Sequence, residues 1–331
     1  MTSLSSEGIK TFIRHVESLE NSEPNDYAFV KEYSLIQEAQ MRDHRDNVSS
    51  LDIGQLESNL KKNRYKDIVP YDDHRIVLSA LEDQNSDYIN ASKIMGVCGE
   101  GDYIAAQGPL SGTVNDFWRM IWEYNIEIVF MACRLIEMKK IKCSQYWSNV
   151  GSSVEFGDIT VFTESEDDVN TECVQRSFRV TKGDEVHFVI QFHYCGWPDH
   201  GVPANPADIC DAIGVMRETR RNCGVPLLIH CSAGCGRTGA IIAIDYAWTL
   251  LEEGKFYETF SLFDLVCDLR KQRMSLVQTP DQYVFVNKVV KSLCEERLIK
   301  MASHTYENVD INQEDSSAQC SQQTSKENDY E

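Results

Sequence analysis

The sequence is poor in basic residues and lacks long apolar runs. It has 32 Lys and Arg against 52 Asp and Glu in 331 residues, which gives a formal charge of −20. Broad nucleic-acid or anionic-membrane surfaces need clustered positive charge, so the composition argues against both. No apolar run approaches the roughly 18 residues that a membrane-spanning helix requires. We therefore expect no nucleic-acid partner and no membrane insertion.

The chain also lacks targeting and metal-binding patterns. Its first residues have neither the basic nor the apolar region of a secretory signal, and Thr2 stands where myristoylation needs Gly. The 12 Cys form no CxxC pair and have no zinc-like spacing to His. Reduced thiols in the cytoplasm are the expectation, with no metal and no cofactor.

The hydrophobic pattern predicts one α/β domain over residues 1–300. Apolar residues at helical spacing predict a helical N-terminal segment at 5–41, and helical spacing returns after Pro203. A buried strand is expected at 226–230. Further helices are predicted at 237–253, 259–271 and 280–300. Other strands are predicted at 75–79, 88–94, 102–106, 126–132, 141–147, 154–163, 173–181 and 186–194.

Residues 301–331 have a different composition. They are rich in Ser, Gln, Asn and acidic residues and poor in large apolar residues. Such a segment cannot bury enough apolar surface to offset the entropy lost on ordering. The sequence therefore predicts a disordered acidic tail.

The segment that carries chemistry is HCSAGCGRTG at residues 230–239. A hydrophobic strand leads into a loop of small residues, and the loop leads into a helix. Successive backbone N–H groups of such a loop form an anion-binding nest, which the helix dipole strengthens. Arg237 can add a bidentate contact to two phosphate oxygens.

Cys231 lies at the mouth of this nest. The loop amides, the helix dipole and Arg237 all favour its thiolate, which can attack phosphorus and form a covalent phosphoenzyme. The same positive groups neutralise the phosphoryl oxygens without a metal. A cysteine at a strand end is more often inert packing, but the full spacing of small residues and Arg-Thr-Gly favours the nucleophile.

This loop resembles the signature of the protein tyrosine phosphatases. The resemblance covers most of residues 5–298, and its PEST-type branch is indicated by DFWRMIWEYN, by MACR and by Cys235. It implies a single catalytic domain with a highly twisted mixed β-sheet flanked by helices, and a phosphate-binding loop between strand and helix. The other matching motifs are KNRYKDIVPYD, SDYINAS, YIAAQGPL, KCSQYW, WPDHGVP and QTPDQY.

The resemblance implies roles in catalysis. Asp199 of the Trp-Pro-Asp motif would protonate the leaving tyrosyl oxygen and then deprotonate water. Gln278 and Gln282 would place that water, and the Thr238 hydroxyl would help the thiol leave. By themselves, Trp-Pro-Asp is also compatible with a simple turn and the Gln pair with a helix N-terminus.

It also implies roles in substrate binding. Tyr65 would form a wall against the phosphotyrosine ring, and Asp67 would hold the peptide backbone. Glu137 would orient Arg237, and Lys142 would lie near the acid loop. The remaining implied residues are Ser232, Ala233, Gly234, Cys235 and Gly236 around the phosphate, with His230 and Trp197 in support.

The sequence thus predicts a protein-tyrosine phosphatase that acts on phosphotyrosine proteins in intracellular signalling. A non-catalytic phosphotyrosine-binding module of the same fold is the alternative, and the Tyr65 wall argues against a dual-specificity enzyme. Tyr306, followed by Glu-Asn, matches a docking motif for phosphotyrosine-reading adaptors or is an incidental tail residue. Oxidised Cys231 has two possible partners, Cys235 or a backbone nitrogen.

Overall fold

The computed structural model describes residues 2–22, 27–46, 48–79, 86–97, 99, 102–198, 201–220 and 225–323, with side chains between 6 and 303. A nine-stranded sheet has the order β1-β2-β3-β11-β4-β10-β9-β8-β7, and β5 and β6 form a separate hairpin. The predicted mixed α/β fold is confirmed. The strands are β1 (Arg75–Val77), β2 (Tyr88–Ile94), β3 (Tyr103–Gln107), β4 (Ile128–Met131), β5 (Ile136–Glu137), β6 (Lys140–Ile141), β7 (Ser153–Phe156), β8 (Ile159–Asn170), β9 (Cys173–Lys182), β10 (Glu185–Tyr194) and β11 (Leu227–Cys231).

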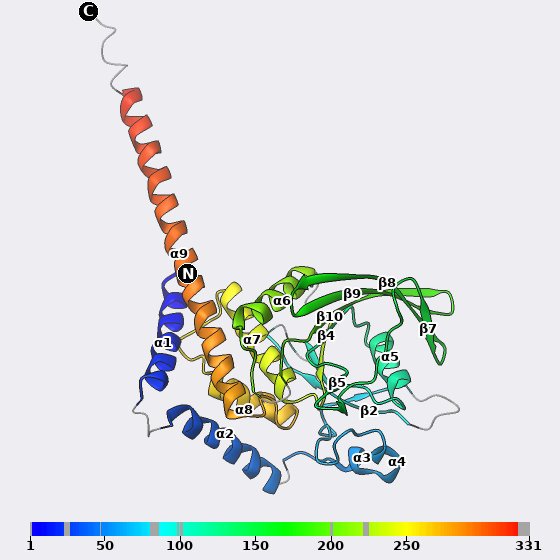
Figure 1. Ribbon diagram of the computed structural model, residues 1–331. Coiled ribbons are helices and arrows are strands. Elements are labelled where there is room, and N and C mark those ends of the chain that lie inside the picture. Colours follow the sequence, from blue (N-terminus) through cyan, green and yellow to red (C-terminus); the bar gives the residue numbers. More distant parts are fainter. Residues whose placement is uncertain are drawn as a thin grey trace, which may run out of the picture.

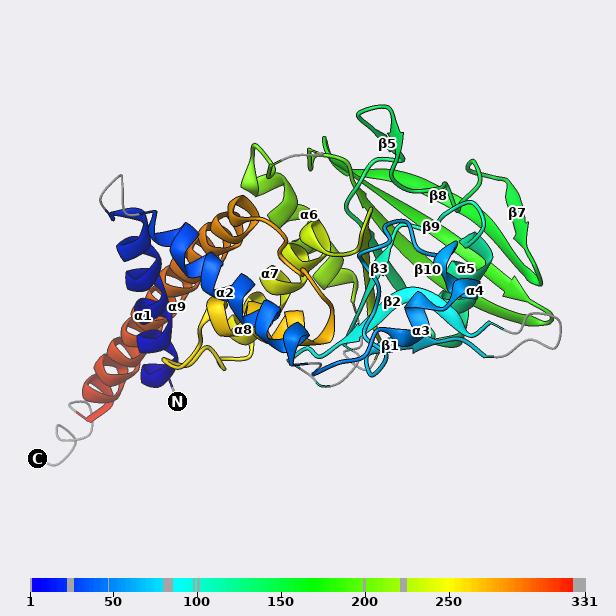
Figure 2. The same ribbon diagram turned by 90° about the horizontal axis from the view of Figure 1, so that it is seen from below.

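The helices cover the sheet unequally. Helices α6 to α9 lie on one side with α1 and α2 outside them, and α5 lies on the other side (Figures 1 and 2). None of the helices in the described part of the chain is long and apolar enough to cross a membrane. The helices are α1 (Thr2–Glu20), α2 (Ala28–Arg45), α3 (Asp52–Gln55), α4 (Glu57–Leu60), α5 (Val114–Glu123), α6 (Pro206–Thr219), α7 (Gly236–Glu252), α8 (Leu262–Gln272) and α9 (Pro280–Gln323).

The central strands place the Cys231 loop. β11 runs parallel to β3 on one side and to β4 on the other, and all five of its residues are buried. A parallel strand covered on both faces has this continuous apolar character. The register pairs Cys231 with Gln107, so the thiol lies at the carboxyl edge of the parallel strands, where open α/β sheets place their ligand sites.

Two predicted strands differ from the structure. The run at 141–147 leaves the hairpin after Ile141, because the Lys142 N–H donates to the Leu135 carbonyl and the Ser144 N–H to the Pro109 carbonyl. The run at 154–163 is two strands, since Gly157 has a φ of 65° and turns the chain between β7 and β8. Glycine adopts this conformation without the steric cost that a Cβ would impose.

The predicted disorder of residues 301–331 stays a prediction. The backbone continues as α9 through Gln323 and projects beyond the rest of the fold (Figure 1). The composition of the tail removes the apolar face that would pack a helix, but residues 281–323 contain no Gly or Pro that would end one. The Tyr306 side chain and residues 324–331 lie outside the described residues.

Candidate active site

The loop between β11 and α7 depends on glycine at its tightest point. Gly234 has a φ of 71°, and a Cβ there would lie 2.3 Å from the Ala106 carbonyl oxygen. Its N–H donates a hydrogen bond to the Cys231 sulfur at 3.3 Å. The close approach of β3 therefore fixes an amide that points at the thiol.

The two thiols of the loop have opposite electrostatic surroundings. Burial opposes ionisation of Cys231, but the Arg237 charge and hydrogen bonding from Thr238 outweigh it and lower the pKa of the Cys231 thiol. Within the described part of the chain the buried Thr238 hydroxyl has no hydrogen-bond partner of normal geometry. Burial raises the pKa of Cys235 to about 11. Of the two loop thiols, Cys231 is therefore the one whose surroundings favour the thiolate.

Arg237 is held by a bidentate ion pair. Its Nη1 and Nη2 donate to the two carboxylate oxygens of Glu137 at 2.6 and 2.8 Å, and Nη1 also donates to the Ala132 carbonyl at 3.1 Å. The Arg134 N–H in turn donates to Glu137 at 3.0 Å. Both charged groups are buried, so the guanidinium keeps one orientation.

Arg273 is a site residue that the sequence analysis missed. It is fully buried, and its guanidinium donates to the Gly234 carbonyl at 2.7 Å and to the Ala233 carbonyl at 3.0 Å. Drawing these carbonyls away from the cavity leaves the loop amides free to face an anion. In the sequence Arg273 is one of several basic residues near a helix end, so its spacing carries no signal of burial.

His230 lies behind the thiol and not in the cavity. One ring nitrogen is 2.9 Å from the Tyr146 hydroxyl and the other is 3.3 Å from the Cys231 carbonyl oxygen. Burial lowers the pKa of His230 to about 3, so the ring is neutral at physiological pH. A neutral ring packed behind the loop fits the predicted supporting role and not that of a general base.

A cavity of about 330 Å³ opens above Cys231. It brings together predicted residues from four separate segments of the sequence, and Gly201, Ile68 and Thr279 complete its lining. The remaining loop and support residues in the described part of the chain do not line this cavity. The predicted residues that line the cavity are Tyr65, Asp67, Lys142, Cys231, Ser232, Ala233, Gly236, Arg237, Gln278 and Gln282.

The acid loop is described only in part. The Trp197 indole donates to the Gly201 carbonyl at 3.1 Å, and Trp197 lines a neighbouring cavity of about 360 Å³ together with Glu137. Asp199 lies outside the described residues. A larger cavity of about 710 Å³ lies at the amino ends of β4 and β10, and it contains none of the predicted site residues.

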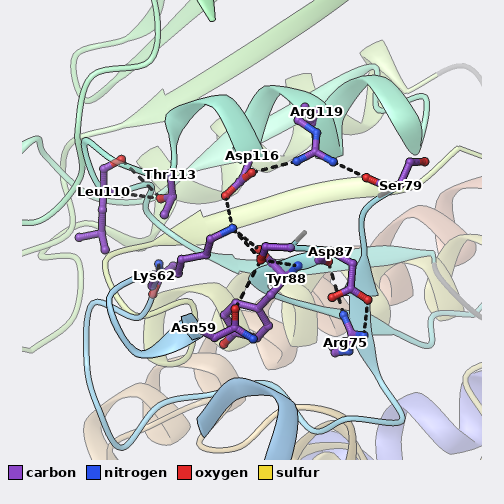
Figure 3. A network of polar contacts seen from close by, with 12 residues as sticks. Asn59, Lys62, Arg75, Ser79, Asp87, Tyr88, Leu110, Thr113, Asp116 and Arg119 are labelled. Atoms are coloured by element: carbon purple, nitrogen blue, oxygen red, sulfur yellow. Dashed lines mark hydrogen bonds and ion pairs between the residues drawn. The ribbon is translucent and has the colours of Figure 1, made fainter. Parts of the chain in front are cut away.

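Tyr65 projects from a firmly anchored loop. Its hydroxyl is 3.1 Å from the Ser232 Oγ. Next to it, Arg64 donates to the carbonyls of Gly108, Pro109 and Ile141 at 2.9, 2.8 and 3.1 Å. At the start of the loop, the Lys62 ammonium pairs with the Asp116 carboxylate at 2.8 Å (Figure 3). The aromatic wall of the cavity is therefore anchored to the segment after β3, to β6 and to α5.

The two glutamines are hydrogen-bonded to each other. The Gln278 N–H donates to the Gln282 side-chain oxygen at 2.9 Å, while the Gln278 side chain remains exposed in the cavity. The Gln282 N–H donates to the Thr279 hydroxyl at 3.2 Å. This segment is thus the capped N-terminus of α9 and a wall of the cavity at the same time.

Comparisons with known proteins agree with this geometry. Residues 59–292 match the family model described as protein-tyrosine phosphatase. Human tyrosine-protein phosphatase non-receptor type 12 is 42% identical over 293 residues, covering 88% of this chain and 37% of the relative. Human non-receptor type 18 is 39% identical, covering 85% of this chain and 61% of the relative. The chain therefore spans less than two thirds of the length of these relatives.

The fold matches a solved structure as well. The crystal structure of the catalytic domain of the human non-receptor type 18 enzyme superposes with a TM-score of 0.81 at 37% identity, covering 86% of this chain and 99% of that one. The relatives of types 12 and 18 confirm the predicted similarity to the PEST-type branch.

Proposed function

Because the chain belongs to the protein-tyrosine phosphatase family, we propose that it hydrolyses phosphotyrosine in proteins through a cysteinyl-phosphate intermediate, in intracellular signalling. One observation carries this proposal: the Cys231 thiol with its lowered pKa lies in a cavity with Arg237 beside it and Tyr65 on its wall. A buried, activated nucleophile next to a fixed cation suits attack on a phosphoryl group.

In the first step the loop amides and Arg237 hold the phosphoryl oxygens. The Cys231 thiolate attacks phosphorus, an S–P bond forms and the bond to the tyrosyl oxygen breaks. Asp199 gives its proton to that oxygen, so the tyrosine leaves neutral. Glu137 keeps Arg237 aligned with the oxygens as their charge is redistributed.

In the second step water hydrolyses the phosphoenzyme. Asp199 now takes a proton from the water, which Gln278 and Gln282 place, and the S–P bond breaks to release inorganic phosphate. The Thr238 hydroxyl stabilises the departing thiolate. Arg237 and the loop amides supply the positive potential for both steps, so the proposed chemistry requires no metal and no cofactor.

The substrate is a phosphotyrosine protein. The Tyr65 wall gives the cavity the depth of an aryl phosphate, Asp67 holds the peptide backbone, and Lys142 lies near the acid loop. A structure of the type 18 relative is described as a complex with HER2 phosphopeptides, which supports this class of substrate. We place the protein in the cytoplasm, since its relatives are of the non-receptor type.

The test compares initial rates on matched phosphotyrosyl and phosphoseryl peptides, in chelator and thiol. We expect rapid phosphotyrosyl turnover that falls by about 10⁴-fold or more in Cys231→Ser. Circular dichroism of the variant controls for folding. Tight phosphopeptide binding by the wild type without turnover would favour the binding-module alternative, and comparable rates on both peptides would contradict the tyrosine specificity.

A further inference from the structure

The segment that precedes Gln278 has an unusual backbone. Val277 has a φ of 57° and Ser275 a φ of 58°, so both occupy the left-handed region. For a β-branched residue this conformation is a genuine outlier, and it persists only where the surroundings impose it. The helix beside it leaves no room for adjustment, since a Cβ on Gly239 would lie 2.3 Å from the Val277 nitrogen.

Two buried side chains hold the carbonyl of Val277. Arg270, from α8, donates from Nη2 to this carbonyl at 2.6 Å and from Nε to the Leu276 carbonyl at 2.9 Å. Tyr33, from α2, donates its hydroxyl to the same Val277 carbonyl at 3.2 Å. Arg270 also donates to the Tyr33 hydroxyl at 2.8 Å and stacks over the ring. We call Arg270 and Tyr33 the Val277 clamp.

The other end of the same peptide group is held as well. The N–H that follows the Val277 carbonyl belongs to Gln278, and it donates to the Gln282 side chain at 2.9 Å. One peptide plane is therefore fixed by the clamp on its oxygen and by Gln282 on its nitrogen. The direction in which the Gln278 side chain leaves the backbone follows from this plane.

Arg270 is a buried cation whose hydrogen-bond acceptors are neutral groups. The residue is buried, and within the part of the chain that the structure describes it has no carboxylate ion-pair partner. A buried cation without a carboxylate is costly unless its donors are satisfied by other strong acceptors. Here those acceptors are two successive carbonyls and one hydroxyl around the strained residue.

We propose that Arg270 and Tyr33 are positioning residues for hydrolysis of the phosphoenzyme, because they fix the peptide from which Gln278 reaches the attacking water. This inference rests on the proposed function, in which Gln278 acts in the second step. It predicts that weakening the clamp slows hydrolysis of the S–P bond and leaves the attack of Cys231 on the substrate unchanged. The N-terminal helix α2 would thereby take part in the second step alone.

The test separates the two steps with p-nitrophenyl phosphate in a stopped-flow instrument. Tyr33→Phe removes the hydroxyl and keeps the ring that stacks on Arg270. Loss of the Tyr33 hydroxyl should lower the rate constant of phosphoenzyme hydrolysis about 3- to 10-fold, the range of one neutral hydrogen bond. The rate constant of phosphorylation and kcat/KM should stay at the wild-type values, because neither contains the hydrolysis step.

Arg270→Lys keeps the charge but removes the guanidinium that bonds the two carbonyls. The rate constant of phosphoenzyme hydrolysis should therefore fall further, by up to about 100-fold if Gln278 is misplaced. Tyr103→Phe is the matched control: Tyr103 is equally buried, and its hydroxyl donates to Asp245 at 2.6 Å at the far end of β3. This control should change neither rate constant.

The outcomes are distinct. Equal losses in both rate constants, no loss in either clamp variant, or a loss of hydrolysis in Tyr103→Phe would overturn the positioning role. A wild-type protein that releases no nitrophenol would instead overturn the proposed function on which the inference rests.

Discussion

Two loops meet above the thiol, and they reach similar backbone conformations by different means. The Cys231 loop enters the left-handed region at Gly234, with a φ of 71°. The segment before Gln278 enters it at Ser275 and Val277, with φ values of 58° and 57°. Glycine does this without steric cost, whereas serine and valine must be held there by their surroundings.

The two loops therefore differ in what determines their backbone shape. In one it is a residue of the loop itself, and in the other it is side chains from distant helices. The loop that we propose binds the phosphoryl group has the glycine it needs in its own sequence. The loop that presents Gln278 obtains its shape from Arg270 on α8 and Tyr33 on α2. Variants in the first loop should therefore damage binding and attack, and variants around the second should damage hydrolysis.

After Cys231→Ser, the largest expected effect is that of Arg237→Lys. Lysine keeps the charge but cannot make the two parallel bonds to Glu137 or present a fork to phosphoryl oxygens. We expect kcat/KM on a phosphotyrosyl peptide to fall about 10²- to 10³-fold, the range of one lost transition-state donor. A fall in kcat alone, as expected for Arg270→Lys, would remove the distinction between the loops.

The next largest effect is expected for Gly234→Ala, which tests whether the close contact with β3 requires glycine at this position. In Gly234→Ala the backbone of the alanine would have to adopt a left-handed conformation. Its methyl group would lie 2.3 Å from the Ala106 carbonyl oxygen. The free energy of unfolding should fall by about 2–4 kcal/mol, which combines the left-handed cost with overpacking. Urea denaturation measures it, with Gly254→Ala as control.

Gly254 also has a positive φ, 67°, but nothing lies within 4 Å of the position that an alanine methyl group would take there. The free energy of unfolding of Gly254→Ala should therefore fall only by the cost of the left-handed conformation. Equal losses in the two variants would mean that contact with β3 is not what fixes Gly234.

A pH series tests the electrostatics of the first loop. The rate of Cys231 alkylation by iodoacetamide should fall about tenfold per pH unit below the pKa of the thiol and level off above it. Since Arg237 and Thr238 lower that pKa despite burial, the plateau should begin below the ordinary thiol value of 9.0. Cys235, with a pKa of about 11, should remain unmodified at pH 7. Mass spectrometry of the modified peptides identifies the site.

The same distinction explains what the sequence could predict. β11, the small-residue loop and the start of α7 follow one another in the chain, so spacing alone indicated an anion site at Cys231 and Arg237. Arg270 and Arg273 could not be found in this way, because basic residues near a helix end are usually solvated. Whether an arginine turns inward depends on carbonyls that other segments bring to it.

Other outcomes have similar causes. The run at 141–147 has the apolar residues of a strand, but its N–H groups find acceptors in neighbouring loops. Residues 301–323 lack a packing face and also a helix breaker; α9 continues through them, and their disorder stays a prediction. The catalytic roles of Asp199, Gln278 and Gln282 stay predictions.

The smallest effect should come from Ser275→Gly in the second loop. Serine at a φ of 58° carries a left-handed cost that glycine avoids, but glycine also gains entropy in the unfolded chain. These terms nearly cancel, so the free energy of unfolding should change by no more than about 1 kcal/mol. The Val277 clamp does not involve the Ser275 side chain, so the rate constant of phosphoenzyme hydrolysis should remain at the wild-type value. If this rate constant fell as it does in Tyr33→Phe, the shape of the second loop would depend on its own residues, and its contrast with the first loop would be lost.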